Sequence, residues 1–161
     1  MSRTLLLGLG NELLRDDGVG LAAARRIAGR IDDRADLARA CVANLDLLPI
    51  LKGYDRVVVV DAYLSEVDPA GTRVHATPED LPRGFGYRSF HTLPFRELLD
   101  LGRVVGWPMP REVSIHGLCV EETTTFGEGF TPAVEDAWRD WADEIAREEF
   151  GVGGEAATGR A

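Results

Sequence analysis

The sequence predicts one α/β domain, a three-layer αβα sandwich in which helices cover both faces of a mostly parallel, twisted sheet. Continuous apolar runs at residues 4–9 and 56–61 are typical of strands that are buried on both faces, as in parallel sheets. Segments with helical spacing separate these runs, and such alternation indicates parallel strands joined by right-handed crossovers. A chain of 161 residues is long enough for one domain with its own core.

The first half of the chain supplies most of this pattern. Its expected elements are a strand at 4–9, a polar loop at 12–18, a helix at 19–30, a weak strand at 37–43, a short helix at 45–51 and a strand at 56–61. The turn Gly8-Leu9-Gly10-Asn11 ends the first strand, where glycine permits unusual backbone angles. Four consecutive valines make 56–61 the clearest strand, and their burial on both faces places it in the middle of the sheet.

The second half is less regular. Its expected elements are a strand at 72–76, a long loop at 78–89, a helix from about 92 to 102, a strand at 112–118, a loop at 121–130 and a final helix from Thr131-Pro132. The strand at 72–76 follows a turn, so it is the candidate for an antiparallel strand at the sheet edge. We expect a single domain over 1–150 and a disordered tail over 151–161, which is rich in Gly and Ala.

The composition narrows the function classes. A formal net charge of -9 disfavours nucleic-acid binding, because an acidic surface repels phosphate. The apolar runs are too short to span a bilayer, and residues 2–15 lack a signal-peptide pattern, so no membrane association and a cytoplasmic location are expected. Cys41 and Cys119 lie in unrelated segments without CxxC spacing, which argues against disulfides and a thiolate zinc site.

The final helix combines an apolar stripe with many acidic residues. The stripe, which we expect to pack in the core, consists of Val134, Ala137, Trp138, Trp141, Ile145 and Ala146. The acidic residues, which we expect to form a solvated face, are Glu135, Asp136, Asp140, Asp143, Glu144, Glu148 and Glu149. Since no apolar patch remains on this helix to form a dimer interface, a monomer is expected.

Ligands of open α/β sheets bind beyond the carboxyl ends of the strands. Two candidate positions lie there: the loop after the first predicted strand, and Asp61, which follows the valine run. The turn Gly8-x-Gly10 also suggests a nucleotide-binding enzyme. However, Leu13 stands where the third glycine of a dinucleotide fingerprint belongs, and no Walker motif occurs, so this class is the least favoured.

Three acidic residues at these positions have different expected roles. Asp16 is expected to cap the first helix, which leaves Asp17 to face the site. Asp61 ends a buried strand, which is costly unless its carboxylate is paired, hydrogen-bonded or metal-bound. A structural hydrogen bond to loop amides explains Asp61 equally well on spacing alone.

The chain has only three histidines. His91 precedes a predicted helix, His116 lies near a strand end and is a rival for the same cleft, and His75 is expected to be solvated on an edge strand. Two carboxylates and one imidazole suit a borderline divalent ion such as zinc or nickel, although the spacing does not require one.

These motifs together resemble the hydrogenase maturation endopeptidases, which process the large subunit of nickel-iron hydrogenases. The likeness covers about residues 3–147. The matching stretches are Leu6-Leu7-Gly8-Leu9-Gly10-Asn11-Glu12-Leu13-Leu14-Arg15-Asp16-Asp17-Gly18-Val19-Gly20, Val-Val-Val-Val-Asp61-Ala62, Ser89-Phe-His91 and Gly129-Phe-Thr-Pro132-Ala-Val-Glu135.

The resemblance implies roles for particular residues. Asp17, Asp61 and His91 would be the catalytic and metal-contacting residues, while Gly8, Gly10 and Asn11 would shape the loop. The metal would be nickel supplied by the substrate, and zinc or cadmium could occupy the same site. The protein would be a metal-dependent, aspartic-type endopeptidase that removes a C-terminal extension from the nickel-loaded large-subunit precursor, with a phosphorylase/hydrolase-like fold.

Two segments depart from the family pattern. The family usually has an Asp-Gly-Gly-Thr-like segment after its second strand, where this chain has Arg39-Ala-Cys-Val42. A Pro-containing segment after the fifth strand is replaced by Cys119-Val120-Glu121-Glu122. The first departure motivates an alternative, in which the protein senses or escorts the metal-loaded precursor without cutting it.

Overall fold

A computed structural model describes residues 1–41, 45–80 and 95–153 of the chain. Its five-stranded sheet has the order β2-β1-β3-β5-β4, in which β4 is antiparallel to β5 and all other neighbours are parallel. The strands are β1 (Thr4–Leu9), β2 (Asp36–Ala40), β3 (Arg56–Tyr63), β4 (Arg73–Ala76) and β5 (Glu112–Cys119). The predicted fold class, including the antiparallel edge strand, is confirmed.

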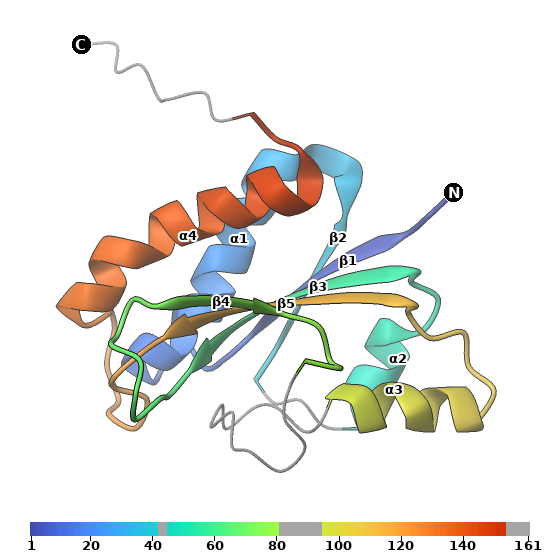
Figure 1. Cartoon of the computed structure of the whole chain (residues 1–161), viewed down its shortest axis with the longest axis horizontal. Helices are drawn as coiled ribbons and strands as arrows, with labels where there is room; N and C mark the ends of the chain where they lie inside the picture. Colours follow the sequence, from blue (N-terminus) through green and yellow to red (C-terminus); the bar gives the residue numbers. More distant parts are fainter. Residues whose placement is uncertain (42–44, 81–94, 154–161) are drawn as a thin grey trace.

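Helices cover both faces of this sheet (Figure 1). The helices are α1 (Val19–Ile31), α2 (Leu47–Leu51), α3 (Phe95–Val104) and α4 (Pro132–Phe150), with short 3-10 turns η1 (Arg15–Gly18) and η2 (Asp32–Arg34). Figure 1 shows α1 and α4 together on one face and α2 and α3 on the other. No helix in the described ranges is long and apolar enough to cross a membrane.

Alternation along β3 divides the core into two halves. Val58 and Val60 belong to the apolar cluster under α1 and α4, whereas Val57 and Val59 belong to the cluster under α2 and α3. Successive side chains of a strand point to opposite faces, so a strand between two helical layers must be apolar throughout. The predicted stripe of α4 is confirmed as core, with Trp141 only 2% exposed.

The boundaries differ from the sequence prediction by a few residues. β3 continues to Tyr63, and α2 begins at Leu47 rather than at residue 45. β2 starts at Asp36 and ends at Ala40. Three predicted segments lie wholly or partly outside the described residues: the loop at 78–89, the start of the helix after it, and the tail over 151–161.

The connections change direction between β1 and β3. From β1 the chain passes through α1, on one face of the sheet, to β2, which lies on one side of β1. From β3 it passes through β4 and then α3, on the opposite face, to β5, which lies on the other side of β3. Such a switch point opens a crevice beyond the carboxyl ends of the two strands, where ligands of open α/β sheets bind. The first loop follows β1 at this point, and Asp61 lies near the end of β3.

Candidate functional site

The loop after β1 is held in a tight, defined conformation. Gly10 has a φ of 143°, a region that L side chains rarely adopt, and its N–H donates to the Ala40 carbonyl at 3.0 Å. The Asn11 side-chain oxygen accepts the Leu13 N–H at 3.0 Å, and the Asn11 N–H donates to Asp17 Oδ2 at 2.9 Å. The loop therefore folds back on itself and orients the Asp17 carboxylate.

Glycines also bring α1 close to the strand ends. A Cβ on Gly20 would stand 2.5 Å from the Leu9 carbonyl oxygen and 2.6 Å from that of Val60. A Cβ on Gly8 would stand 2.8 Å from the Cβ of Ala24. The start of α1 thus packs directly on the backbone where β1 and β3 approach their ends.

The two predicted acids of the site, Asp17 and Asp61, are both buried, at 3% and 2% exposure. Asp17 belongs to η1, which contacts β3, the strand that carries Asp61. The Ala62 N–H donates to Asp61 Oδ1 at 2.8 Å. Two buried carboxylates at a switch point fit a divalent cation, because carboxylate oxygens are ligands for zinc and for harder ions.

His91, the third predicted contact, lies outside the described residues. Within residues 1–41, 45–80 and 95–153, the one group of three or more possible metal ligands is His75, His116 and Glu148. Of the three predicted metal contacts, the structure therefore describes Asp17 and Asp61.

Asp16 does not cap α1, contrary to the sequence prediction. Its fully buried carboxylate accepts hydrogen bonds from the Thr131 N–H and hydroxyl, both at 2.7 Å, and from the N–H groups of Glu121 and Glu122 at 3.3 and 3.2 Å. Among the described residues, no side chain caps α1, whose first turn follows η1 directly. Asp16 instead joins the first loop to the loop after β5 and to the start of α4.

The loop after β5 has its own anchor. The Glu122 carboxylate accepts the N–H groups of Thr124 and Thr125 at 2.8 Å each and the Thr124 hydroxyl at 2.9 Å. These backbone and hydroxyl hydrogen bonds favour the ionised form and lower the pKa of Glu122 to about 2. The loop that holds Asp16 in place is therefore itself ordered by a carboxylate that is charged at neutral pH.

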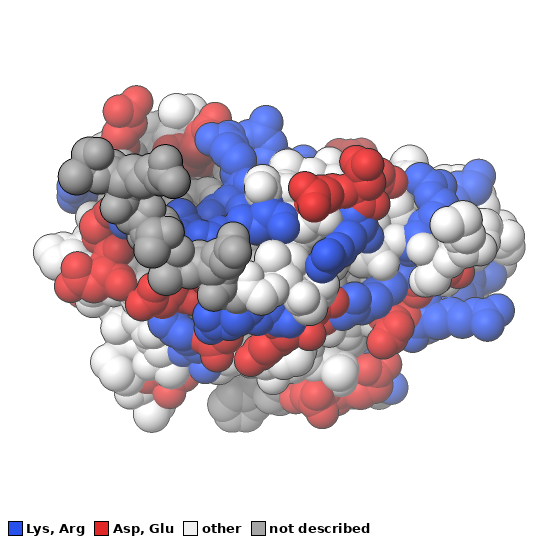
Figure 2. Space-filling view, turned by 90° about the horizontal axis from the view of Figure 1, so that it is seen from above, with Lys and Arg blue, Asp and Glu red and all other residues white. Residues whose placement is uncertain are grey.

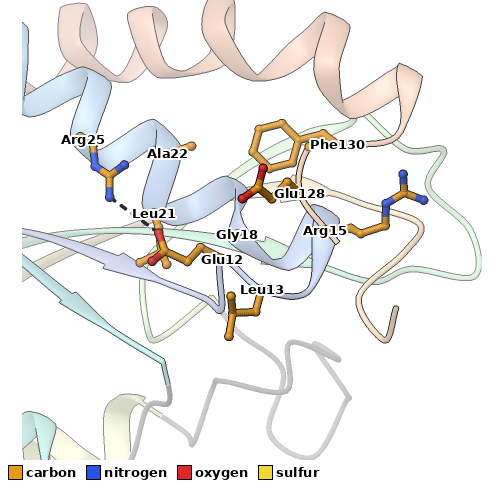
Figure 3. Close-up of a pocket in the computed structure, with 10 residues that line it drawn as sticks. Glu12, Leu13, Arg15, Gly18, Leu21, Ala22, Arg25, Glu128 and Phe130 are labelled. Atoms are coloured by element: carbon orange, nitrogen blue, oxygen red, sulfur yellow. Dashed lines mark ion pairs between the residues drawn. The ribbon is translucent and has the colours of Figure 1, made fainter. Parts of the chain in front are cut away.

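Two cavities adjoin the first loop. One, of about 300 Å³, lies between this loop, α1 and the segment before α4; it is lined by Glu12, Leu13, Arg25 and Phe130, among others (Figure 3). Glu12 and Arg25 form an ion pair of 3.8 Å across it. The other, of about 470 Å³, lies between the loop and the end of β2. An extended peptide could reach the loop from either side.

His116 does not line the same cleft as Asp61. It pairs with Val60 in the β3–β5 register, one residue before the level of Asp61, and its Nε2 lies 2.6 Å from Glu149 Oε1 of α4. Because Val60 and α4 belong to one face, the Asp61 side chain starts toward the other. His75, predicted to be solvated, is half exposed and stacks on His116 with ring centroids 4.1 Å apart.

The acidic side of α4 is also not simply a solvated face. Glu149 is 6% exposed and pairs with Arg56, and Asp143 accepts two hydrogen bonds from Arg26, at 2.7 and 2.9 Å. Figure 2, seen from the side of α1 and α4, shows basic side chains interspersed with acidic ones. Sequence spacing gave no signal for these contacts, because the partners lie 93 and 117 residues away.

Comparison with known proteins adds the deciding observation. The sequence model described as "HycI: Hydrogenase maturation protease" matches residues 29–148. The chain belongs to the hydrogenase maturation protease family. The match includes Asp61, and it begins after the loop that carries Asp17.

Individual relatives agree. The chain is 28% identical to the hydrogenase 2 maturation protease of Escherichia coli K12 over 136 residues, which cover 83% of this chain and 82% of that one. It is 29% identical to the hydrogenase expression/formation protein HupD of Rhodobacter capsulatus over 136 residues, 82% of this chain and 64% of that one.

Solved structures show the same fold. The hydrogenase maturating endopeptidase HybD of Escherichia coli superposes with a TM-score of 0.75 at 25% identity, covering 92% of this chain and 94% of that one. The HybD protease of Thermococcus kodakarensis superposes with a TM-score of 0.70 at 24% identity, covering 92% and 99%. The mostly parallel sheet with one antiparallel pair is thus the fold of this protease family, and family membership supports a hydrolase with a processing role in hydrogenase maturation.

Proposed function

We propose that this protein removes a C-terminal extension from the nickel-loaded large-subunit precursor of a nickel-iron hydrogenase. Asp17, Asp61 and His91 contact the metal, which arrives as part of the substrate. The observation that carries the proposal is the pair of buried carboxylates at the switch point between β1 and β3. Family membership supplies the reaction class.

The two carboxylates are oriented in ways that suit such a role. The Asn11 N–H holds Asp17, and the Ala62 N–H holds Asp61. These hydrogen bonds help to set the direction of each carboxylate, and a carboxylate can accept several hydrogen bonds and contact a cation as well. A cation held there could polarise a scissile carbonyl or position the peptide next to the site.

The first loop also offers space for the chain that is to be cut. Residues 10–13 line the 470 Å³ cavity together with Leu21 and the end of β2, and Glu12 and Leu13 line the other cavity as well. In this proposal, a flexible C-terminal tail lies in one of these hollows, against the loop that precedes Asp17. In this proposal the large-subunit precursor is the partner, and the protein works without nucleic acid or a membrane.

An intact-mass assay tests the proposal. The nickel-loaded precursor is incubated with the wild type, Asp61→Asn, Asp17→Asn, His91→Ala and a control, Asp100→Asn, which removes an exposed acid of α3. We expect loss of a C-terminal peptide with the wild type and the control, and none with the other three. Circular dichroism checks that each variant is folded. Unimpaired cleavage by Asp61→Asn would refute the site assignment.

A second candidate is an escort that binds the metal-loaded precursor without cutting it. The segment Arg39 to Cys41, which lines the larger cavity, has no glycine where the family usually has two. In the same assay, a stable complex with an intact precursor would favour this function. Stoichiometric loss of the tail would exclude it.

A further inference from the structure

A second group of metal-ligating side chains lies on the α4 face of the sheet, apart from Asp17 and Asp61. One ligand atom from each of His75, His116 and Glu148 lies within 4.8 Å of the others. The three come from β4, β5 and α4, so tertiary structure alone brings them together. We propose that they bind a borderline divalent cation of the Zn²⁺ type.

Strand pairing orients the two imidazoles. His75 and His116 are directly opposite each other in the antiparallel β4–β5 register, and their rings stack with an interplanar angle of 20°. Each Nε2 lies near one oxygen of Glu149, at 3.4 Å for His75 and 2.6 Å for His116. The backbone of two paired strands therefore holds the two rings next to each other.

The ion pairs around His75 and His116 leave Glu148 as the acid that is available to a cation. Arg73 pairs with Glu144, and Arg56 pairs with Glu149. Glu148 has no ion pair within the described part of the chain and is exposed. Two neutral imidazoles and one carboxylate form a donor set that zinc commonly uses, with a fourth position left for water.

The surroundings of the group match a ligand site. A cavity of about 170 Å³ is lined by His75, His116 and Glu148, together with Arg73 and Trp141. Trp141 is 2% exposed, and its indole N–H has no acceptor within the described residues. Buried polar groups are nearly always satisfied, and a metal-bound water in the cavity that Trp141 lines would offer this N–H an acceptor.

His116 also has the partner that ligating histidines usually have. Its Nε2 lies at hydrogen-bonding distance from the nearly buried Glu149 carboxylate. A carboxylate on one ring nitrogen fixes the tautomer and orientation of a ligating histidine. A bound ion would clamp the edge strand β4 to β5 and to the end of α4, which protects an exposed edge.

Calorimetric titration of untagged, chelator-treated protein with Zn²⁺ near pH 7.5 tests this. Three variants and a control separate the sites: His75→Gln and Glu148→Gln change the proposed ligands, Asp61→Asn changes the carboxylate pair, and Glu135→Gln removes an acid at the other end of α4. We expect His75→Gln and Glu148→Gln each to weaken the affinity for Zn²⁺ at the His75, His116 and Glu148 site by at least about tenfold. Asp61→Asn and Glu135→Gln should leave it unchanged, whatever the outcome of the cleavage assay.

Replacing the buried His116 could prevent folding, so its role is followed by a second measurement. In ¹⁵N NMR spectra of the wild-type imidazoles, Zn²⁺ should shift the ring resonances of both His75 and His116. Failure of the wild type to bind Zn²⁺, equal binding by His75→Gln, or loss with Asp61→Asn alone would each overturn the proposal.

Discussion

Asp16 and Asp17 are adjacent in sequence and both buried, yet their surroundings differ. Asp16 accepts four hydrogen bonds from Glu121, Glu122 and Thr131, all on segments more than 100 residues away. Asp17 accepts the N–H of Asn11, six residues away in its own loop. The first carboxylate therefore holds the fold around the site, and the second is oriented within it.

This difference predicts opposite phenotypes. Asp16→Ala would leave three backbone N–H groups without their acceptor and lower the free energy of unfolding by about 3 kcal/mol. Asp17→Asn keeps an oxygen for the Asn11 N–H, so its unfolding free energy should fall by no more than about 1 kcal/mol while processing is lost. Urea unfolding measures the first effect and the intact-mass assay the second. Equal destabilisation by both variants would contradict the assigned roles.

Helix α1 has one position that has no room for a side chain and another that is open. Gly20 lies against the backbone of β1 and β3, whereas a Cβ on Gly29 would meet nothing within 4 Å. Both are helical glycines, so they share the same entropic cost relative to alanine. They differ only in what surrounds them.

The pair gives a matched test of how α1 packs. Gly20→Ala would push the helix off the strand ends and should lower the unfolding free energy by about 3 kcal/mol, because two carbonyl oxygens cannot move aside. Gly29→Ala should raise it by about 0.5 to 1 kcal/mol, since alanine favours a helix. Thermal unfolding of both variants provides the measurement. A stabilising Gly20→Ala would mean that α1 does not lie where the structure places it.

Ion pairs join helices and strands across the molecule despite its excess of acidic residues. Asp143 of α4 accepts hydrogen bonds from Arg26 of α1 and lies 3.2 Å from Arg30. The hydrogen bonds from Arg26 lower the pKa of Asp143 despite its burial, and the charges of Arg26, Arg30 and Arg147 add to this. The two helices over one face of the sheet are thereby linked by charge as well as by apolar contacts.

This link makes part of the stability depend on pH. A carboxylate whose pKa is lower in the folded state stabilises the fold above its ordinary pKa of 3.8, and this contribution disappears as the pH falls through the folded value. Near neutral pH, Asp143→Asn should lower the unfolding free energy by about 1 to 2 kcal/mol.

Urea unfolding at several pH values checks this prediction. The difference between wild type and Asp143→Asn should shrink below pH 3.8, because the carboxylate becomes protonated first in the unfolded chain and then, at its lower folded pKa, in the native state. The exposed pair Asp100–Arg103 serves as a control, since Asp100→Asn should change stability by less than about 0.5 kcal/mol. A difference that stays constant down to strongly acidic pH would refute the linkage.

The local pattern of residues was enough to predict the strands, most of each helix and the place of Asp61 near the end of β3, because period, length and apolar runs are local properties of a chain. It also carried the family resemblance, which the family match confirms over residues 29–148. Tertiary structure alone decided that Asp16 binds the loop after β5, that His116 faces α4, and that His75 stacks on His116. These contacts depend on strand order and on which face a helix covers, and neither has a signature in the spacing of residues along the chain.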